Sequence, residues 1–317
     1  MNKILITGGC GFIGSHLTEY IFKKLKQSKI IIYDKITYAA NKKYLSNIKA
    51  SKRVKIVQAD INNLKKLTYS SRGVNLLIHV AAESHVDKSF KLSKKFIITN
   101  VLGTANVMEA ARINKVKKII HVSTDEVYGE IFKGSFSENA KFNPSNPYSS
   151  SKAAAEMIVN GYKHSYKLPV TIIRSNNIYG TRQYPEKLIS GCCLSLIKKR
   201  KFYLHGNGNQ KRTFLHVNDF CDAVYKIIVN TKHINEIYNI GSYEELRNIE
   251  VVKLICDYLK IDFKKNIFFK KDRPFNDFRY SVNFSKLRRL SWKPKSRFAK
   301  KLPELIEWYK KNKNLFL

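Results

Sequence analysis

Cysteines, acidic residues and long apolar runs are all scarce in this chain of 317 residues. Its five cysteines are an odd set with no Cys-x-x-Cys pair, which argues against a disulfide framework and favours reduced thiols in the cytoplasm. No stretch approaches the roughly 20 apolar residues that a membrane span needs. A strand-like run already begins by Lys3, so we expect no signal or transit peptide and no membrane association.

Acidic residues number 24 against 59 lysines and arginines, which gives a formal net charge of +35. Such an excess raises the question of nucleic-acid binding. The basic residues are mostly lysines and are scattered, with only short clusters such as residues 198–201, and no recognition module is visible. We therefore expect no dedicated nucleic-acid binding, although the charge would attract an anionic substrate.

A glycine-rich turn near the start of the chain predicts a nucleotide-binding unit. Residues 7–14 read Thr-Gly-Gly-Cys-Gly-Phe-Ile-Gly, between an apolar run and a helix-like segment. Without side chains at Gly8 and Gly11 the backbone can approach a pyrophosphate, toward which the helix N-terminus points its free N–H groups. The next strand-like run ends at Asp34, whose carboxylate can accept from a ribose 2′-hydroxyl and would repel a 2′-phosphate. NAD is therefore favoured over NADP, and Lys35 moderates that preference.

Strand-like and helix-like segments alternate through the first half of the chain. The expected strands cover residues 3–6, 30–33, 54–57, 76–80, 118–122 and 170–174, and the main helices cover 64–71, 90–113 and 148–167. Such alternation predicts an α/β fold with a Rossmann-type, doubly wound parallel sheet. The alternation ends after about residue 176, so we expect an NAD-binding domain over 1–176, to which a later segment returns. A smaller C-terminal α/β domain over 177–317 would close a cleft at the carboxyl ends of the strands.

Tyr148 and Lys152 are spaced to lie on one face of a helix. A lysine beside a phenol lowers its pKa from about 10 toward neutrality, so that the phenolate can act as a base. Three other pairs share this spacing: Tyr20/Lys24, Tyr38/Lys42 and Tyr309/Lys313. Only Tyr148 opens a helix that follows a later strand, and that strand ends in Ser-Thr-Asp-Glu at residues 123–126.

With these motifs the chain resembles the extended short-chain dehydrogenase/reductases, and within them the nucleoside-diphosphate-glucose 4,6-dehydratases, over essentially its whole length. The resemblance rests on the turn at 7–14, Ala-Ala-Glu-Ser-His-Val-Asp at 81–87, Thr-Asp-Glu at 124–126, Tyr148/Lys152, Ser-Asn-Asn at 175–177, Pro-Glu-Lys-Leu at 185–188 and Arg-Pro-Phe-Asn-Asp at 273–277. The Thr-Asp-Glu triplet is the most specific of these, because related nucleotide-sugar epimerases carry small residues in place of the two acids.

The resemblance implies a set of catalytic roles. Tyr148 would take the proton of the C4 hydroxyl while hydride leaves C4 for NAD⁺, with Lys152 lowering the Tyr148 pKa and holding the nicotinamide ribose. Thr124 would hydrogen-bond the developing C4 oxygen. Glu126 would remove the C5 proton and a protonated Asp125 would donate to the departing C6 hydroxyl, which requires their pKa values to be pushed apart. The hydride would then return to C6, so that the net reaction is the loss of water.

The resemblance also implies binding residues, and no metal site is expected. Besides Tyr148 and Lys152, the positions that match cofactor contacts are Gly8, Gly11, Phe12, Ile13, Gly14, Asp34, Lys35, Thr37, Asp60, Ile61, Ala81, Ala82, Thr99 and Asn177. Besides Thr124, the positions that match contacts to the sugar, the diphosphate or the base are Ser84, Asn176, Lys187, Leu188, Tyr203, His205, Arg212, Asn248, Arg273 and Asn276. A guanidinium fork suits a diphosphate, which singles out Arg212 and Arg273.

Two segments depart from the bacterial dTDP-glucose enzymes. Residues 176–180 carry one more residue between the Asn pair and Tyr-Gly, and they look like the plant-type UDP-glucose 4,6-dehydratases, as does the segment 273–277. Uracil differs from thymine by one methyl group, which a pocket discriminates by only about 1–3 kcal/mol. UDP-glucose is slightly favoured, with dTDP-glucose as an accepted or equal substrate.

Two alternative functions remain open from the sequence. A nucleotide-sugar 4-epimerase would use the same fold, although the two carboxyl groups argue against it. A nucleic-acid-associated protein that has kept the fold without catalysis would explain the basic charge. For the enzyme, the resemblance implies a homodimer whose helices near 90–113 and 148–167 form an intermolecular four-helix bundle.

Overall fold

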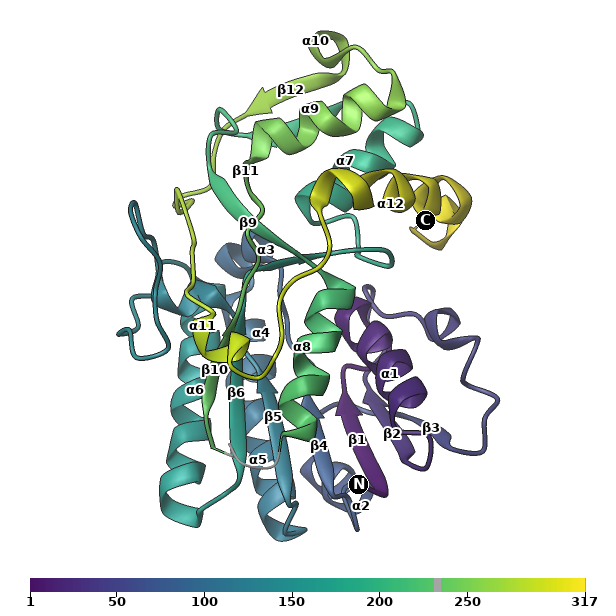
Figure 1. Cartoon of the computed structure of the whole chain (residues 1–317), viewed down its shortest axis with the longest axis vertical. Helices are drawn as coiled ribbons and strands as arrows, with labels where there is room; N and C mark the ends of the chain where they lie inside the picture. Colours follow the sequence, from purple (N-terminus) through teal and green to yellow (C-terminus); the bar gives the residue numbers. More distant parts are fainter. Residues whose placement is uncertain (231–234, 317) are drawn as a thin grey trace.

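The computed structural model describes residues 1–230 and 235–316, and a seven-stranded parallel sheet lies at its centre (Figure 1). The strand order is β10-β6-β5-β4-β1-β2-β3. The strands are β1 (Lys3–Thr7), β2 (Lys29–Asp34), β3 (Val54–Gln58), β4 (Leu76–His79), β5 (Lys118–Val122), β6 (Val170–Ser175) and β10 (Ile237–Ile240). All six strands expected in the first half are present, and the prediction of a Rossmann-type parallel sheet is confirmed.

The strands at the middle of the sheet are apolar on both faces. Every residue of β4 and β5 is buried, and Ile4, Leu5 and Ile6 of β1 have no exposed surface. Parallel strands covered by helices on both sides bury both faces, so they are continuous apolar runs rather than alternating ones. The β-branched residues of these runs suit such pleated, packed surfaces.

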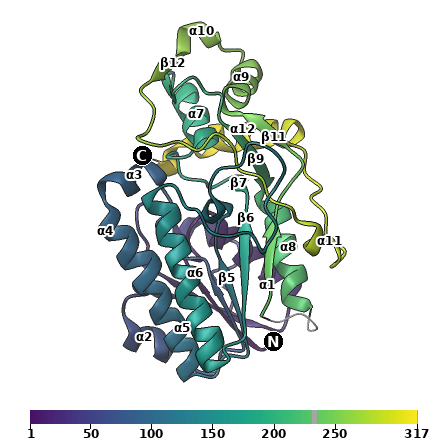
Figure 2. The same cartoon turned by 90° about the vertical axis from the view of Figure 1, so that its left-hand side faces the viewer.

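Helices cover both faces of the sheet (Figures 1 and 2). α1 (Phe12–Lys24) and α8 (Val217–Val229) pack on one face, in one apolar core with Ile6 and Ile78. α2 (Leu64–Ser70), α5 (Gly103–Ile113) and α6 (Pro147–Tyr166) cover the other face. α6 begins where the sequence predicts it, because Pro147 stands in its first turn and the Asn146 side chain accepts from the Ser149 N–H.

The prediction of a single helix over residues 90–113 is wrong, because the structure divides this segment into several helical pieces. Leu92 leaves helical geometry and separates α3 (Val86–Lys91) from α4 (Ser93–Phe96), and a π-helical turn, η2 (Ile97–Leu102), precedes α5. The wide turn presents the buried Asn100 to its neighbours: Asn100 accepts from the Glu83 N–H at 2.9 Å and donates to Ser151 Oγ of α6 at 2.9 Å. A polar bridge between two segments therefore accompanies the irregular turn, which an apolar periodicity does not reveal.

A second lobe lies beyond the carboxyl edge of the sheet and has its own apolar core. Its elements are β7 (Asn177–Tyr179), α7 (Leu188–Ile197), β8 (Phe202–His205), β9 (Lys211–His216), β11 (Glu245–Arg247), α9 (Asn248–Leu259), α10 (Phe263–Asn266), β12 (Ile267–Lys270), α12 (Phe298–Asn312) and η4 (Lys313–Phe316). Between these elements the chain returns to the first lobe, where α8, β10 and α11 (Ser285–Arg288) join the core of the sheet. The expected boundary after residue 176 stays a prediction.

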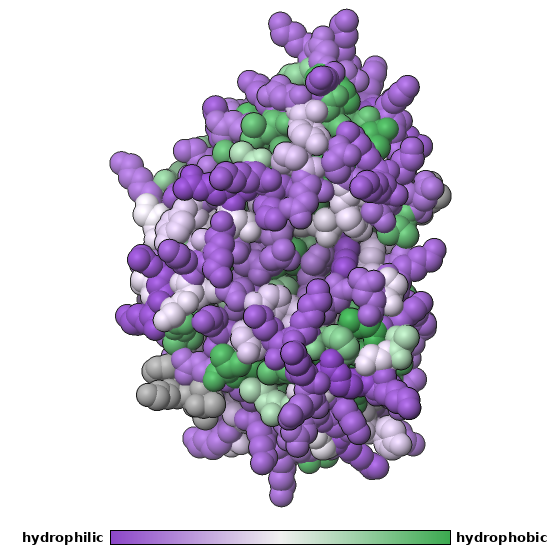
Figure 3. Space-filling model, turned by 45° about the vertical axis from the view of Figure 1, so that its right-hand side comes forward, coloured by the Kyte–Doolittle hydropathy of each residue, from purple (hydrophilic) through white to green (hydrophobic). Residues whose placement is uncertain are grey.

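The surface that Figure 3 presents is largely hydrophilic, as the lysine content leads one to expect. Among the described residues, no helix is both long enough and apolar enough to cross a membrane. The five cysteines are all free and buried.

A buried ion pair supports the strand end that carries Asn176. The Arg174 side chain donates to Glu156 of α6, at 2.7 Å from Nη2 to Oε2, and from Nη1 to the Tyr128 hydroxyl, also at 2.7 Å. Arg174 and Glu156 are both almost completely buried. Removing one partner of such a pair leaves an uncompensated charge inside the protein.

We therefore expect Glu156→Ala to lower the free energy of unfolding by about 3–5 kcal/mol. Urea unfolding followed by circular dichroism measures this change. Glu304→Ala, which breaks the exposed pair of Glu304 with Lys301 on α12, is the matched control and should cost less than about 1 kcal/mol. Equal losses in the two variants would contradict the stabilising role of the buried pair.

Candidate active site

A cavity of about 620 Å³ lies between the two lobes, at the carboxyl edge of the sheet. Its walls come from residues that follow β1, β2, β4, β5 and β6 and from the loops of the second lobe. Each residue that the sequence assigns to catalysis, to the cofactor or to the substrate lines this cavity. The fold therefore brings the whole predicted set together, while the role of each member stays a prediction.

The first turn of α1 forms an anion-binding end of the cavity. Gly8 has a φ of +69°, and a Cβ at this position would lie 2.8 Å from backbone atoms of Ala81. Gly11 precedes the helix and no side chain caps it, so the first N–H groups of α1 remain available to a ligand. Both features fit the pyrophosphate of NAD, because a close backbone approach and free N–H groups are what that group requires.

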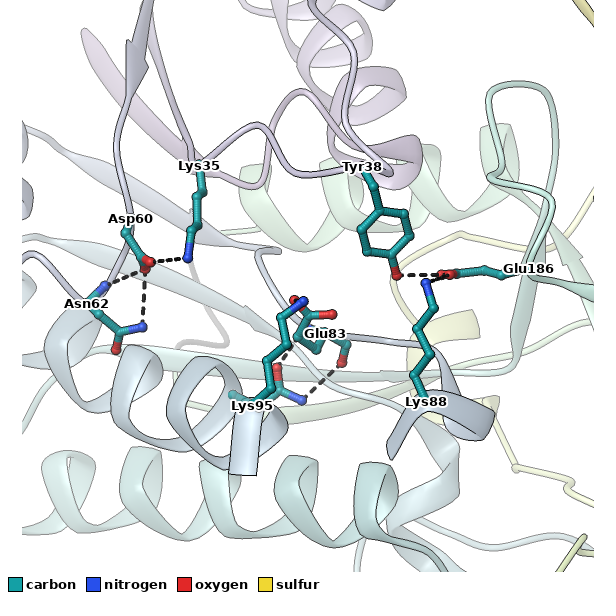
Figure 4. A network of polar contacts seen from close by, with 9 residues as sticks. Lys35, Tyr38, Asp60, Asn62, Glu83, Lys88, Lys95 and Glu186 are labelled. Carbon is teal, nitrogen blue, oxygen red and sulfur yellow. Dashed lines mark hydrogen bonds and ion pairs between the residues drawn. The ribbon is translucent and has the colours of Figure 1, made fainter. Parts of the chain in front are cut away.

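The ribose end is formed by the residues that follow β2 and β3. Asp34 accepts backbone N–H groups from Cys10 at 2.9 Å and from Ile36 at 2.7 Å, which fixes the carboxylate at the end of β2. Lys35 forms an ion pair with Asp60 at 2.7 Å (Figure 4). The positive charge that would favour a 2′-phosphate is thus paired with a carboxylate, which agrees with the preference for NAD.

The Thr-Asp-Glu triplet starts the short helix η3 (Asp125–Tyr128), directly beyond β5. The Thr124 side chain accepts from the Glu126 N–H at 3.3 Å, and the Asp125 carboxylate accepts from the Asn176 amide at 2.7 Å. Burial and the nearby charge of Glu126 raise the pKa of Asp125 to about 7. Burial also raises the pKa of Glu126, against the lowering effect of the positive charges of Lys187 and Arg212.

Tyr148 and Lys152 open α6 on the same side of the cavity, and both are buried. The prediction that Lys152 lowers the pKa of Tyr148 is wrong for this arrangement. Burial and the charges of Glu126 and Asp125 raise the pKa of Tyr148, with only the Thr124 hydroxyl opposing them. The Lys152 ammonium donates to the Val122 carbonyl at 2.8 Å, and burial lowers its own pKa to about 8. Low-dielectric surroundings disfavour both charged forms, which the sequence spacing does not reveal.

The second lobe brings its predicted residues to the opposite wall. The Lys187 ammonium donates to the Ser84 carbonyl at 2.7 Å, across the two lobes. Arg212 donates from Nη1 to the Lys211 carbonyl at 2.8 Å and from Nη2 to the Asn276 side chain at 3.1 Å. This wall therefore offers amines and guanidinium groups, which suit an anionic ligand.

The sequence analysis missed four acidic residues of the cavity wall: Glu83, Asp87, Glu186 and Asp277. Asp87 pairs with Arg273 and His205, and Glu186 accepts from the Tyr38 hydroxyl at 2.9 Å and pairs with Lys88 at 3.1 Å (Figure 4). All four acids stand inside motifs on which the family resemblance rests, so the signal was available. No group of three or more His, Cys, Asp or Glu side chains in the described part of the chain could hold a metal ion.

The raised pKa of Asp125 predicts a pH-dependent contribution to stability. Because its folded pKa of about 7 exceeds the unfolded value near 3.9, the folded protein holds a proton that the unfolded chain loses between these values. The stability from this group is fully present below about pH 4 and is lost as the pH rises toward 7.

We therefore expect the free energy of unfolding, compared with that of Asp125→Asn, to fall by about 2–4 kcal/mol from pH 4 to pH 7. Urea unfolding at several pH values measures this difference. A difference that stays constant with pH would mean that the carboxyl group is ionised throughout.

Comparisons with known proteins agree with this geometry. The family model described as GDP-mannose 4,6 dehydratase matches residues 5–305. The dTDP-D-glucose 4,6-dehydratase of Dictyostelium discoideum is 39% identical, over 100% of this chain and 83% of the relative. A trifunctional UDP-glucose 4,6-dehydratase/UDP-4-keto-6-deoxy-D-glucose 3,5-epimerase/UDP-4-keto-L-rhamnose-reductase of Arabidopsis thaliana is 37% identical, over 98% of this chain, which spans 47% of that protein.

Solved structures give the same result. The dTDP-glucose 4,6-dehydratase of Streptomyces venezuelae, solved with NAD bound, superimposes with a TM-score of 0.96 at 35% identity, over 99% of this chain and 98% of that chain. The UDP-glucose 4-epimerase of Thermotoga maritima superimposes with a TM-score of 0.88 at 24% identity over 98% of this chain and 99% of that chain, a likeness that shows the fold alone. The chain belongs to the nucleotide-sugar 4,6-dehydratases of the extended short-chain dehydrogenase/reductase superfamily.

Proposed function

We propose that this chain is an NAD-dependent hydro-lyase that converts UDP-glucose or dTDP-glucose to the 4-keto-6-deoxyglucose derivative, in the cytoplasm and as a homodimer. The observation that carries the proposal is that Thr124, Asp125 and Glu126 line the same cavity as Tyr148 and Lys152. UDP-glucose is slightly favoured by the plant-like segment at 176–180, and relatives named for each nucleotide match about equally well.

The chemistry explains why this set of side chains is needed. The proton at C5 of glucose is not acidic until C4 is a ketone, so oxidation at C4 has to precede the loss of water. When bound, NAD⁺ supplies a positively charged acceptor for the C4 hydride and later the donor that reduces C6. The glycine turn at 8–14 would hold its pyrophosphate, and Asp34 its ribose.

Tyr148 acts as the base for the C4 hydroxyl proton, and Thr124 hydrogen-bonds the C4 oxygen. The Tyr148 pKa is raised by burial and by the charges of Glu126 and Asp125, so it falls only when positive charge enters the cavity or when those acids are neutral. Lys152 lies one turn further along α6, where its ammonium donates to the Val122 carbonyl, and it would hold the nicotinamide ribose. Its pKa of about 8 leaves it mostly protonated at neutral pH.

Asp125 and Glu126 divide the elimination of water between them. Asp125 has a pKa near 7 and thus retains a proton that it can donate to the departing C6 hydroxyl. Glu126 removes the C5 proton; burial raises its pKa, and the positive charges of Lys187 and Arg212 act against that rise. The charge of Glu126 in turn holds the proton on Asp125, which is how one neighbouring pair serves as acid and base.

Turnover tests the proposal directly. Incubation with UDP-glucose and with dTDP-glucose, each with NAD⁺, should give a product that has lost one water by mass spectrometry. Both substrates should react, with UDP-glucose equal or slightly better in kcat/KM. A product of unchanged mass would indicate an epimerase, and no turnover together with salt-sensitive DNA binding would support the nucleic-acid alternative.

The double variant Asp125→Asn/Glu126→Gln separates oxidation from dehydration. It should bind NAD⁺ normally and still oxidise C4, because the groups that act at C4 remain. NADH absorbance should then appear in a single turnover, while the dehydrated product falls at least about a hundredfold, as expected when an acid and a base are both removed. Dehydration at the normal rate would remove both residues from the mechanism.

An exposed apolar surface supports the proposed dimer. It lies on the segment from α4 to α5 and on α6, which run side by side in Figure 2. Its exposed apolar residues are Leu92, Ile97, Ile98, Leu102, Ile113, Met157 and Tyr166. Apolar side chains gathered on two neighbouring helices favour an interface with a second copy.

We expect Leu102→Asp/Met157→Asp to lower the mass measured by light scattering from that of two chains to that of one. Charges at the centre of an apolar interface oppose its formation. Tyr69→Asp, at an equally exposed aromatic residue on α2, is the control and should remain dimeric. A wild-type protein that is monomeric at high concentration would refute the dimer.

A further inference from the structure

The short segment 84–88, between β4 and the first turn of α3, contacts the second lobe at three points. The Ser84 carbonyl accepts from Lys187, and Asp87 pairs with Arg273 and His205. Lys88 pairs with Glu186, as Figure 4 shows. Lys187, His205 and Arg273 are all predicted to bind the nucleotide sugar. Two residues of this segment, Ser84 and Asp87, therefore contact three of the predicted substrate-binding side chains of the second lobe.

Asp87 holds its two partners by one atom each. Its Oδ1 forms an ion pair with Nε of Arg273, although these two atoms lack hydrogen-bond geometry. Its Oδ2 lies 3.4 Å from Nε2 of His205. The three side chains are between a quarter and a third exposed and line the cavity. Burial raises the pKa of Asp87, but the hydrogen bond from His205 and the charge of Arg273 outweigh it and hold that pKa well below its usual value. The carboxylate thus stays charged at neutral pH.

The side-chain nitrogens of Arg273 and His205 that do not contact Asp87 have no hydrogen-bond partner among the described residues. Within the described residues, no group accepts from Nη1 or Nη2 of Arg273, and Nδ1 of His205 is buried without a hydrogen bond. Arg212 differs, because its Nη1 and Nη2 already donate to Lys211, Phe278 and Asn276. Of the two arginines predicted to bind the diphosphate, Arg273 is the one whose terminal nitrogens remain free. A buried polar atom without a partner, such as Nδ1 of His205, is costly unless a ligand satisfies it.

We propose that Asp87 is a positioning residue for the nucleotide sugar. It fixes Arg273 by Nε and His205 by Nε2, so that the terminal nitrogens of Arg273 are presented to the diphosphate and Nδ1 of His205 to a polar atom of the nucleotide. This inference rests on the proposed function for its ligand. An arginine held by one edge loses little further rotational freedom when it binds, which increases affinity for the ground state and the transition state alike.

The negative charge of Asp87 would by itself repel a diphosphate. That repulsion is offset because the carboxylate is paired with a guanidinium and an imidazole, and its field at a distance is correspondingly small. The two effects have opposite signs, so measured affinity distinguishes them: a positioning role makes loss of the charge weaken binding, whereas dominant repulsion makes it tighten binding.

Asp87→Asn tests this inference by calorimetry with free UDP and dTDP and by steady-state kinetics with both nucleotide sugars. Affinity for the free nucleotides should fall about tenfold, the size of one charge-assisted contact, and KM should rise by a similar factor. The kcat value and the affinity for NAD⁺ should stay within about twofold of the wild-type values. The contact that is lost stabilises the bound substrate and the transition state equally, so its loss raises KM and leaves kcat unchanged. Asp257→Asn, which removes the same charge at an exposed position of α9, should change none of these values.

The same substitution in an Arg273→Gln background shows whether Asp87 acts through Arg273. The tenfold loss should largely disappear there, which a general loss of stability would not produce. Unchanged or tighter nucleotide binding by Asp87→Asn, or an equal loss in both backgrounds, would overturn the inference. Asp87→Ser serves the same measurements if thermal unfolding shows that Asp87→Asn does not fold. Nucleotide binding is read without turnover, so an inactive wild-type enzyme would refute the proposed function separately.

Discussion

The parallel register of the central strands is the constraint on which the site depends. β5 pairs with β4 on one side and β6 on the other, so Thr124 and Asn176 leave the sheet at the same edge as the glycine turn after β1. The hydrogen bond from Asn176 to Asp125 spans two neighbouring strand ends and needs this register. A slip of one residue would turn every side chain of β5 to the other face and separate the acids from Tyr148. The apolar residues of β4, β5 and β6 therefore determine the catalytic geometry as much as the polar residues do.

Burial then sets the protonation of the groups that this register assembles. Asp125, Glu126, Tyr148 and Lys152 are all buried, and the pKa of each is shifted in the direction that favours its neutral form. One consequence is useful, because it keeps a proton on Asp125. Another opposes catalysis, because it also keeps the proton on Tyr148. The same low dielectric strengthens the effect on the phenol of any positive charge that enters the cavity.

The sequence predicts most of the architecture and places the site residues together, because these features depend on local patterns. Ile119, Ile120 and Val122 make β5 rich in β-branched apolar residues, and Asn146 and Pro147 mark the start of α6 locally. The break at Leu92 is not predictable in this way, since the apolar pattern continues through it and the irregular turn serves a contact between Asn100 and a distant loop. The shift of the Tyr148 pKa is also not predictable from local patterns, because it depends on burial and on acids from another segment. The role of Asp87 likewise depends on two partners in the second lobe.

The distribution of charge shows why net charge was a poor guide to function. Among the described residues, eight acidic side chains line the cavity, out of 24 in the sequence. Only six lysines and arginines line it, out of 59 in the sequence. The excess of lysine therefore belongs to the solvated surface, where it is screened over about 10 Å at moderate ionic strength. Inside the cavity, acids hold cations such as Lys35 and Arg273 in place, and we propose that Asp125 and Glu126 transfer protons. An anionic substrate would be attracted over long distances by the surface, but it would be bound by the few cations that these acids orient.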